Sequence, residues 1–299
     1  MDRKAVNKRA VEALVKAGAF DLLHADRAAT LASVALAFEW ADTQDANALQ
    51  GGLFDMGDSH GSSTQEPALA GVPPWDVRER LMQEKSALGY FLSGHLFDAW
   101  RDEVQRIART PLAELAAAAA ARRGPGEVQV MAGIVTDARS VNGQRGKVLI
   151  FKLDDGSEAV EAVVNDELIA HQRELLVEDQ LVILQGKLQQ DRFTGGVRLN
   201  VLQVWDLAAA RARFGRYIAV DINGSSPPVA DVLRLWPAKR VVTEHCDLQQ
   251  GLAIRLRVQR STATAEIELG DDARFWPCDE ALGRWRSIAH GGVAKIVYD

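Results

Sequence analysis

The chain has 299 residues, of which 47% are apolar and 25% are charged, and its net charge is −6. This length and composition suit about two or three packed domains and exclude global disorder. The negative charge argues against a protein that coats nucleic acid through bulk positive charge, so any such contact must be local. No apolar run is long enough for a secretory signal or a membrane span, and the two cysteines, Cys246 and Cys278, suit a reducing compartment. We therefore expect a soluble, cytoplasmic protein.

Residues 1–49 are predicted to be helical. Apolar residues among basic ones favour an amphipathic helix over residues 4–17, Gly18 ends it, and a second helix is expected from about Leu22 to Trp40. Helix, tight turn and helix is the form of a helix-hairpin-helix unit, whose turn can direct backbone N–H groups at a phosphate. The alternative is an ordinary helical hairpin with Gly18 as its C-cap. The residues of this turn expected to contact a phosphate are Lys16, Gly18 and Ala19, and the family resemblance given below implies that the phosphate belongs to a duplex backbone.

Residues 50–74 combine a short apolar motif with a polar, Gly-, Ser- and Pro-rich segment. The motif is Gln50-Gly51-Gly52-Leu53-Phe54. Two large apolar side chains beside flexible residues can act as an anchor for a pocket in another protein. The alternative is that Leu53 and Phe54 end a helix and pack back onto the chain's own core. The residues that follow read as a linker or mobile loop.

Residues 75–126 are predicted to be a helical connector. A helix is expected to begin after Asp76 and to end at Ser93-Gly94-His95, and an alanine-rich helix is expected over residues 112–123. The Gly-Pro-Gly sequence that ends at Gly126 marks a domain boundary.

Residues 127–207 carry the pattern of an OB-fold β-barrel. Three strands, a short helix and two further strands are predicted, which is the order of this barrel. The chemistry of such a barrel is binding through one face and its loops. Phe151 is compatible with either the binding face or the core. The alternative is a barrel that binds protein or nothing. The residues expected to bind a single strand are Arg145, Lys147, Phe151, Arg192 and Phe193.

Residues 208–299 are predicted to form a small α+β domain, so the whole chain is a multidomain α+β protein. Its expected elements are a helix to Phe214, a strand at 217–222, a helix at 229–236, a strand at 240–245, a hairpin at 252–269, a helix at 279–289 and a strand at 294–298. No catalytic residues and no metal ligands are predicted in this domain or elsewhere in the chain.

Three segments resemble the alpha subunit of bacterial replicative DNA polymerase III. They are Asp2 to Asp21, the run from Glu84 to His95, and Ala132-Gly133-Ile134-Val135-Thr136-Asp137. The resemblance covers essentially the whole chain. It implies, in order, a helix-hairpin-helix, a sliding-clamp-binding peptide, an OB domain and a C-terminal domain that binds the tau subunit of the clamp loader. The clamp-binding residues that it implies are Gln50, Leu53 and Phe54.

The same resemblance implies that the catalytic palm of the family is missing from this chain. We therefore expect a fragment, a split gene product or a truncated gene model that is inactive alone, although its family is a DNA-directed DNA polymerase. No cofactor is expected, because Mg²⁺ would belong to the absent catalytic domain. The predicted function is to tether the polymerase to the clamp, to template DNA and to the clamp loader during replication. The alternative is a free-standing OB-fold protein that binds single-stranded nucleic acid.

Overall fold

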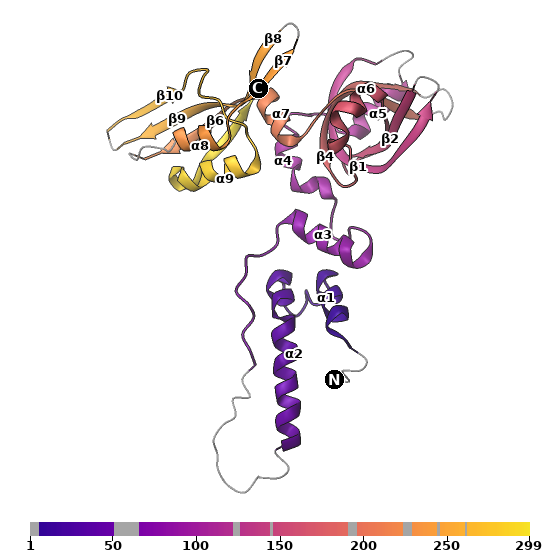
Figure 1. The fold of residues 1–299 in the computed structure, drawn as a ribbon, viewed down its shortest axis with the longest axis vertical. Helices are drawn as coiled ribbons and strands as arrows, with labels where there is room; N and C mark the ends of the chain where they lie inside the picture. The colour runs from indigo at the N-terminus through magenta and orange to yellow at the C-terminus, as the bar shows by residue number, and fades with distance from the viewer. Residues whose placement is uncertain are drawn as a thin grey trace. The chain divides into compact units, whose positions relative to one another are not determined.

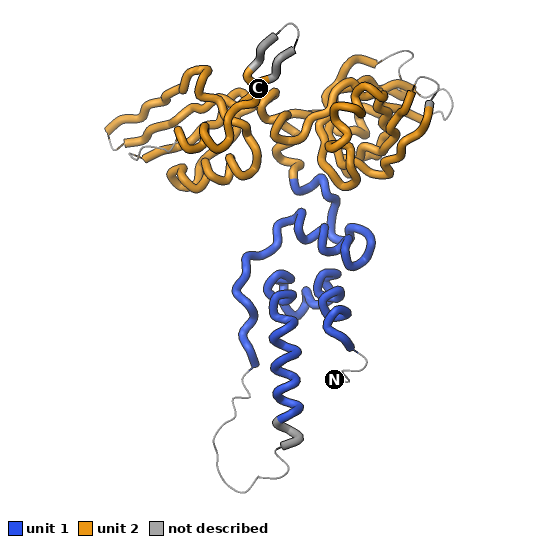
Figure 2. The backbone as a smooth tube through the Cα atoms, viewed as in Figure 1, with its two compact units in different colours: residues 1–99 blue, residues 100–299 orange. Residues whose placement is uncertain are grey.

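The computed structural model describes most of the chain. The described residues are 6–50, 66–121, 126–143, 146–190, 196–223, 229–243, 246–260 and 262–299, without the side chains of 47–50, 143 and 241–248. They divide into two compact units, residues 1–99 and residues 100–299 (Figure 2). No helix among them is both long enough and apolar enough to cross a membrane.

Unit 1 begins with two helices joined by a tight turn. Helix α1 (Lys8–Lys16) starts after Asn7, whose side chain accepts the Ala10 N–H, and Gly18 leaves the helix with a φ of 85°. Helix α2 (Arg27–Gln50) starts five residues later than expected, because the Asp26 side chain caps it by accepting the Ala29 N–H at 3.1 Å. It also extends ten residues beyond the predicted end at Trp40.

Helix α3 (Val77–Leu88) and the 3-10 helix η1 (Leu96–Ala99) complete unit 1. Asp76 caps α3 as predicted, by accepting the Glu79 N–H at 2.7 Å. The predicted end at residues 93–95 is wrong. The helix ends at Leu88, because Gly89 adopts a left-handed φ of 86° as its C-cap.

Unit 2 contains the closed barrel predicted for residues 127–207 (Figure 1). Its strands run in the order β1-β2-β3-β5-β4, with β3 and β5 parallel and the other neighbours antiparallel. Helix α6 (Asp166–Gln172) and the 3-10 helix η2 (Arg173–Leu175) connect β3 to β4. The strands are β1 (Val128–Gly143), β2 (Gly146–Asp154), β3 (Ala159–Val164), β4 (Leu181–Gln190) and β5 (Val197–Trp205).

The helix before the barrel is held to it by a buried carboxylate. Helix α5 (Leu112–Ala121) packs Leu112 into the barrel core, and Asp155 accepts the Leu112 N–H at 2.9 Å. Burial alone would raise the pKa of Asp155, but its hydrogen bonds to Leu112 and to the Ser157 hydroxyl and backbone lower it. The short helix α4 (Arg101–Val104) precedes α5.

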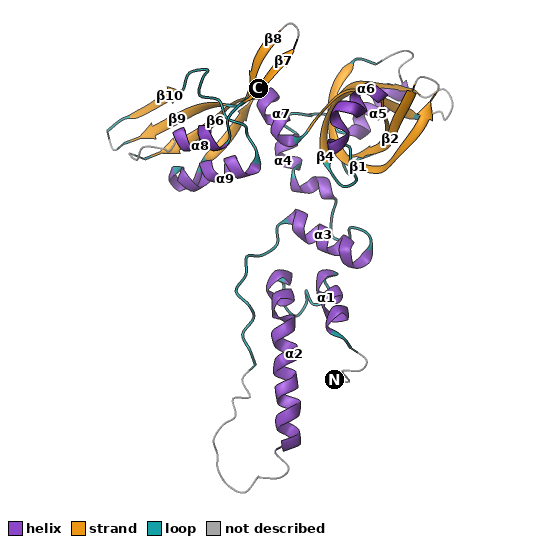
Figure 3. Cartoon of the chain, in the orientation of Figure 1, coloured by secondary structure: helices purple, strands orange, loops and turns teal. Residues whose placement is uncertain are grey.

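The last part of unit 2 combines a sheet with helices, as Figure 3 shows. The sheet has four strands. Helix α7 (Leu207–Phe214) leads into the sheet, whose strand order is β10-β9-β6-β11. Helices α8 (Val229–Leu235) and α9 (Asp279–Ile288) contribute Val232 and Trp285 to its core. The sheet strands are β6 (Gly215–Ile222), β9 (Ala253–Gln259), β10 (Thr264–Glu268) and β11 (Ala294–Tyr298).

One prediction for this region is incomplete. The strand expected at residues 240–245 is β7 (Lys239–Thr243), and it forms a separate two-stranded sheet with β8 (Cys246–Gln250), which the sequence pattern did not reveal. A 3-10 helix, η3 (His290–Gly292), precedes β11.

Candidate nucleic-acid interface

The outer face of the barrel strands β1, β2 and β3 carries a hollow of about 420 Å³. Side chains alternate across a strand, so Phe151 and Leu153 of β2 point into the core while Ile150 and Lys152 point outward. The strand register places Lys152 opposite Glu161 of β3. The residues that line the hollow are Asp137, Arg139, Ile150, Phe151, Lys152 and Glu161.

A β-bulge positions two of these charges. The pairing of β1 with β2 shifts between Thr136 and Arg139, and Asp137 within the bulge has a φ of 55°. A bulge bends a strand and redirects its side chains. It brings the Asp137 carboxylate to 2.6 Å from Lys152 Nζ, while Arg139 pairs in register with Ile150.

The charges on this face are closely interleaved. Glu161 Oε1 lies 2.8 Å from Arg198 Nη2, and Glu161 Oε2 lies 3.5 Å from Arg139 Nη2. The hydrogen bond with Lys152 lowers the pKa of Asp137 and raises that of Lys152. Asp137 and Glu161 face three cations, Arg139, Lys152 and Arg198. Asp154 of β2 adds a third negative charge, which also raises the pKa of Lys152, so acids and cations on this face are balanced in number.

The structure describes only two of the five residues that were predicted to bind a single strand, Lys147 and Phe151. Lys147 is exposed near the start of β2. Arg145, Arg192 and Phe193 lie outside the described residues. The placement of Phe151 on the binding face is wrong, because its side chain is 1% exposed and packs in the barrel core. A ring in that position has no free face for a base.

Three cations of this face were not predicted from the sequence. Arg139, Lys152 and Arg198 come from three strands, and only the barrel brings them together. The signal available in the sequence was the alternation around Phe151, because once that ring is assigned to the core, Lys152 must point outward.

The turn between α1 and α2 does not offer the backbone donors that were expected. The Gly18 N–H donates to the Val15 carbonyl at 3.0 Å and the Ala19 N–H to the Leu14 carbonyl at 3.0 Å. Arg27 fills the inside of the turn and donates to the Lys16 carbonyl at 3.3 Å. The Gly18 and Ala19 N–H groups are thus engaged within the turn, and contact of Lys16, Gly18 and Ala19 with a duplex backbone stays a prediction. The C-cap of α1 is Ala17, and Gly18 follows it.

The apolar motif of residues 50–54 lies almost entirely outside the described residues. Gln50 is the last residue of α2, but its side chain is not among those described, and Leu53 and Phe54 lie outside the described residues.

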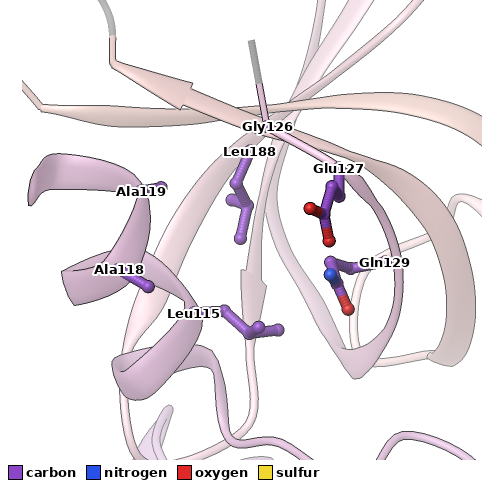
Figure 4. A pocket seen from close by; sticks show the side chains of 7 residues that line it. All are labelled: Leu115, Ala118, Ala119, Gly126, Glu127, Gln129 and Leu188. Atoms are coloured by element: carbon purple, nitrogen blue, oxygen red, sulfur yellow. The ribbon is translucent and has the colours of Figure 1, made fainter. Parts of the chain in front are cut away.

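A second hollow in unit 2 is too small for a base or a nucleotide. Figure 4 shows Leu115, Ala118 and Ala119 of α5 beside Leu188, with Glu127 and Gln129 next to them. Its volume is about 60 Å³, room for about two water molecules.

Among the residues that the structure describes, no group of three or more His, Cys, Asp or Glu side chains could hold a metal ion.

One family model matches the barrel region of the chain. Residues 129–207 match the family model described as an OB-fold nucleic acid binding domain. The crystal structure of a small single-stranded DNA-binding protein from Streptomyces coelicolor aligns with 28% of this chain and 96% of its own, at 18% identity and a TM-score of 0.25.

Two curated relatives match most of the chain. DNA polymerase III subunit alpha of Neisseria meningitidis serogroup B is 37% identical over 217 residues, which are 72% of this chain and 18% of that protein. The subunit of the same name from Vibrio cholerae is 30% identical over 295 residues, which are 96% of this chain and 24% of that protein. The chain thus spans about a fifth to a quarter of the length of these relatives. It is a homologue of one part of DNA polymerase III subunit alpha, and that part includes an OB-fold nucleic acid binding domain.

Proposed function

We propose that this chain is the non-catalytic C-terminal part of a replicative DNA polymerase III alpha subunit, and that it tethers the polymerase to its template, its sliding clamp and its clamp loader. The observation that carries the proposal is an OB barrel whose outer face brings Arg139, Lys152 and Arg198 together, in a chain homologous to that subunit. Acidic side chains offset these cations, so the face suits weak, salt-sensitive contact with single-stranded DNA.

The clamp contact is assigned to Gln50, Leu53 and Phe54, and two features support it. Gln50 ends the long helix α2, and the residues from Gly51 to Glu66 contain no apolar run that could form a core of their own. Two weak links to DNA and clamp raise the effective concentration of the primer end more than either link alone. The C-terminal sheet domain is proposed to contact the tau subunit of the clamp loader through residues that we leave unassigned.

Calorimetry with the sliding clamp tests the anchor. Replacing Leu53 and Phe54 together by Ala should raise the Kd at least about tenfold, since buried apolar anchors dominate such contacts. Leu69→Ala is the matched control, because Leu69 is an exposed apolar residue of the same interhelical segment. Equal clamp affinity of the double variant and the wild type would refute the assignment.

The second candidate function is single-strand binding without any clamp contact, which the OB-fold match over residues 129–207 favours. Fluorescence anisotropy with a labelled oligo-dT separates the two. If Lys152→Ala weakens oligonucleotide binding and the chain has no affinity for the clamp, the free-standing function is the better one. If the chain binds no oligonucleotide at low salt, the barrel is not a DNA site, and this part of both proposed functions is refuted.

A further inference from the structure

The strand β11 lies at one edge of the C-terminal sheet, since it pairs with β6 on one side only in the order β10-β9-β6-β11. The Val293 carbonyl accepts the Asp221 N–H at 3.1 Å, which places the backbone groups of residues 293, 295 and 297 toward β6. In an antiparallel pair these alternate with groups that point away, so the N–H and C=O of Ala294 and Ile296 face the open side. Such an edge is a template for another strand.

Two hollows follow this open edge. One, of about 420 Å³, lies along Lys295 to Asp299, and the other, of about 210 Å³, reaches Ala294 and Arg286 of α9. They share Arg106, Lys295, Ile296 and Tyr298, so they form one groove beside β11, which we call the β11 groove.

The wall of the groove opposite β11 is formed by α4, and hydrogen bonds fix this helix to the sheet. Glu103 of α4 accepts hydrogen bonds from the Tyr298 hydroxyl and from Arg211 Nε, both at 2.7 Å. Arg211 also donates to Asp279 Oδ1 at 2.6 Å, at the start of α9. Partly buried polar contacts therefore hold this wall of the groove in place, and they do not involve the charged face of the barrel.

The charges of the groove are unbalanced. The side chains of Arg106, Arg286 and Lys295 are exposed, and none of the three makes a side-chain hydrogen bond or an ion pair with a residue that the structure describes. Arg286 still helps to lower the pKa of Glu103. The neighbouring carboxylates of Glu103 and Asp299 are engaged, by Arg211 and by Arg216 respectively. Asp102 is the other acid at the groove, so cations are in excess.

We propose that the β11 groove binds an acidic peptide of a separate protein, in extended conformation, as a strand added to the edge of the sheet. The open N–H and C=O groups of Ala294 and Ile296 would pair with the peptide backbone. Carboxylates on one face of the peptide would meet Arg106 and Arg286, and those on the other face would meet Lys295. The inference rests on the geometry of unit 2 and requires neither the barrel nor Gln50 to act as proposed above.

A second copy of this chain is a poorer occupant. Its own acidic edge is β10, but Glu268 of that strand lies 3.1 Å from Arg255, and Glu266 lies 3.4 Å from Arg257. Those glutamates are already neutralised. A nucleic-acid strand would use the cations but leave the open backbone groups of β11 unpaired, so a peptide fits the groove better.

The test uses the full chain and a fluorescent peptide of about six residues, the usual length of a strand, with the sequence Glu-Glu-Val-Val-Glu-Glu, which places carboxylates on both faces. Arg286→Glu should raise the Kd about tenfold, whereas Arg284→Glu, a change of the same charge on the same helix, should change it less than about twofold. Both arginines are exposed. Equal losses in the two variants would mean a bulk charge effect and would overturn the site.

A second pair of probes separates strand addition from charge attraction. The same peptide with alternate amides N-methylated keeps its carboxylates but cannot pair along β11, and it should not bind. Equal binding of the methylated peptide overturns strand addition, as does complete displacement of the acidic peptide by an oligo-dT of equal charge. Concentration-dependent self-association of the chain that Lys295→Glu abolishes would replace the separate peptide by a second copy.

Discussion

Glu161 of β3 accepts a hydrogen bond from Arg198 Nε of β5 at 3.0 Å, across the parallel pair that closes one side of the barrel. The same carboxylate lies 3.5 Å from Arg139 of β1. One acid thus holds two of the three cations of this face. At the proposed DNA site, a phosphate would have to compete with Glu161 for Arg139 and Arg198.

We expect Glu161→Gln to raise the affinity of the chain for oligo-dT about two- to fivefold, because part-exposed ion pairs contribute at most about 1 kcal/mol. The plot of log K against log salt should steepen by roughly 0.7 for each arginine released. Anisotropy titrations at several salt concentrations measure both. Glu158→Gln is the control, since Glu158 is an exposed acid of the same barrel outside the hollow. Unchanged or weaker binding by Glu161→Gln would show that the face is not the DNA site.

Phe151→Leu tests the correction made for that residue. Because Phe151 is 1% exposed in the barrel core, this change should lower the free energy of unfolding by roughly 1 to 2 kcal/mol through lost packing. Oligo-dT affinity should stay the same at a temperature where the variant is folded. Urea unfolding and anisotropy on one sample provide the two values. A large loss of affinity in the folded variant would return Phe151 to the binding face.

Unit 1 should lose stability in acid through one carboxylate. Glu84 is buried, lies 2.8 Å from Arg27 Nη1, and accepts the N–H groups of Leu92 and Ser93, both at 2.9 Å. Burial alone would raise the pKa of Glu84, but these hydrogen bonds lower it from 4.5 to about 2. A lowered pKa gives stability that is complete above 4.5 and is lost as the pH falls from 4.5 toward 2.

Glu84→Gln removes this pH dependence. Near pH 7 the variant should be roughly 2 to 4 kcal/mol less stable, and the difference should shrink below pH 4.5. Urea unfolding of wild type and variant across this range gives the curve. Glu79→Gln serves for comparison, because Glu79 is an exposed acid of the same helix. A constant difference at every pH would contradict the assigned role of Glu84.

Arg211 is expected to be the most sensitive polar residue of unit 2. Its side chain is 4% exposed and donates to Glu103, Asp279 and the Pro277 carbonyl. Burial alone would raise the pKa of Glu103, but its bonds with Arg211 and Tyr298 hold it below its usual value. Removing one partner of such a pair leaves a buried charge unmatched.

Arg211→Ala should therefore lower the free energy of unfolding by roughly 3 to 5 kcal/mol. Glu103→Gln in the same chain should recover part of that loss, and a double-mutant cycle by urea unfolding measures the coupling. Strict additivity of the two changes would show that the contacts of Arg211 and Glu103 do not contribute to stability as a pair.

Local patterns in the sequence were enough for most of the secondary structure. The alternation of apolar residues predicted the five barrel strands in their correct order, and Asp76 marked the start of α3. They were insufficient where two local signals competed. Gly89 and Gly94 can each end a helix. The structure ends α3 before Gly89, and the Leu92 and Ser93 N–H groups then turn back to donate to Glu84 of the same helix.

The sequence by itself determined the barrel, the helical region before it and the mixed domain after it, because strand and helix periods are properties of neighbouring residues. Only the tertiary structure decided which side of β2 is exposed to solvent and that Phe151 is buried in the core. It also decided that Arg139, Lys152 and Arg198 share one face. It also brought Glu103 to Tyr298 and opened the groove beside β11. The physical reason is that strand pairing and buried ion pairs join residues far apart in the chain, and no local pattern encodes those partners.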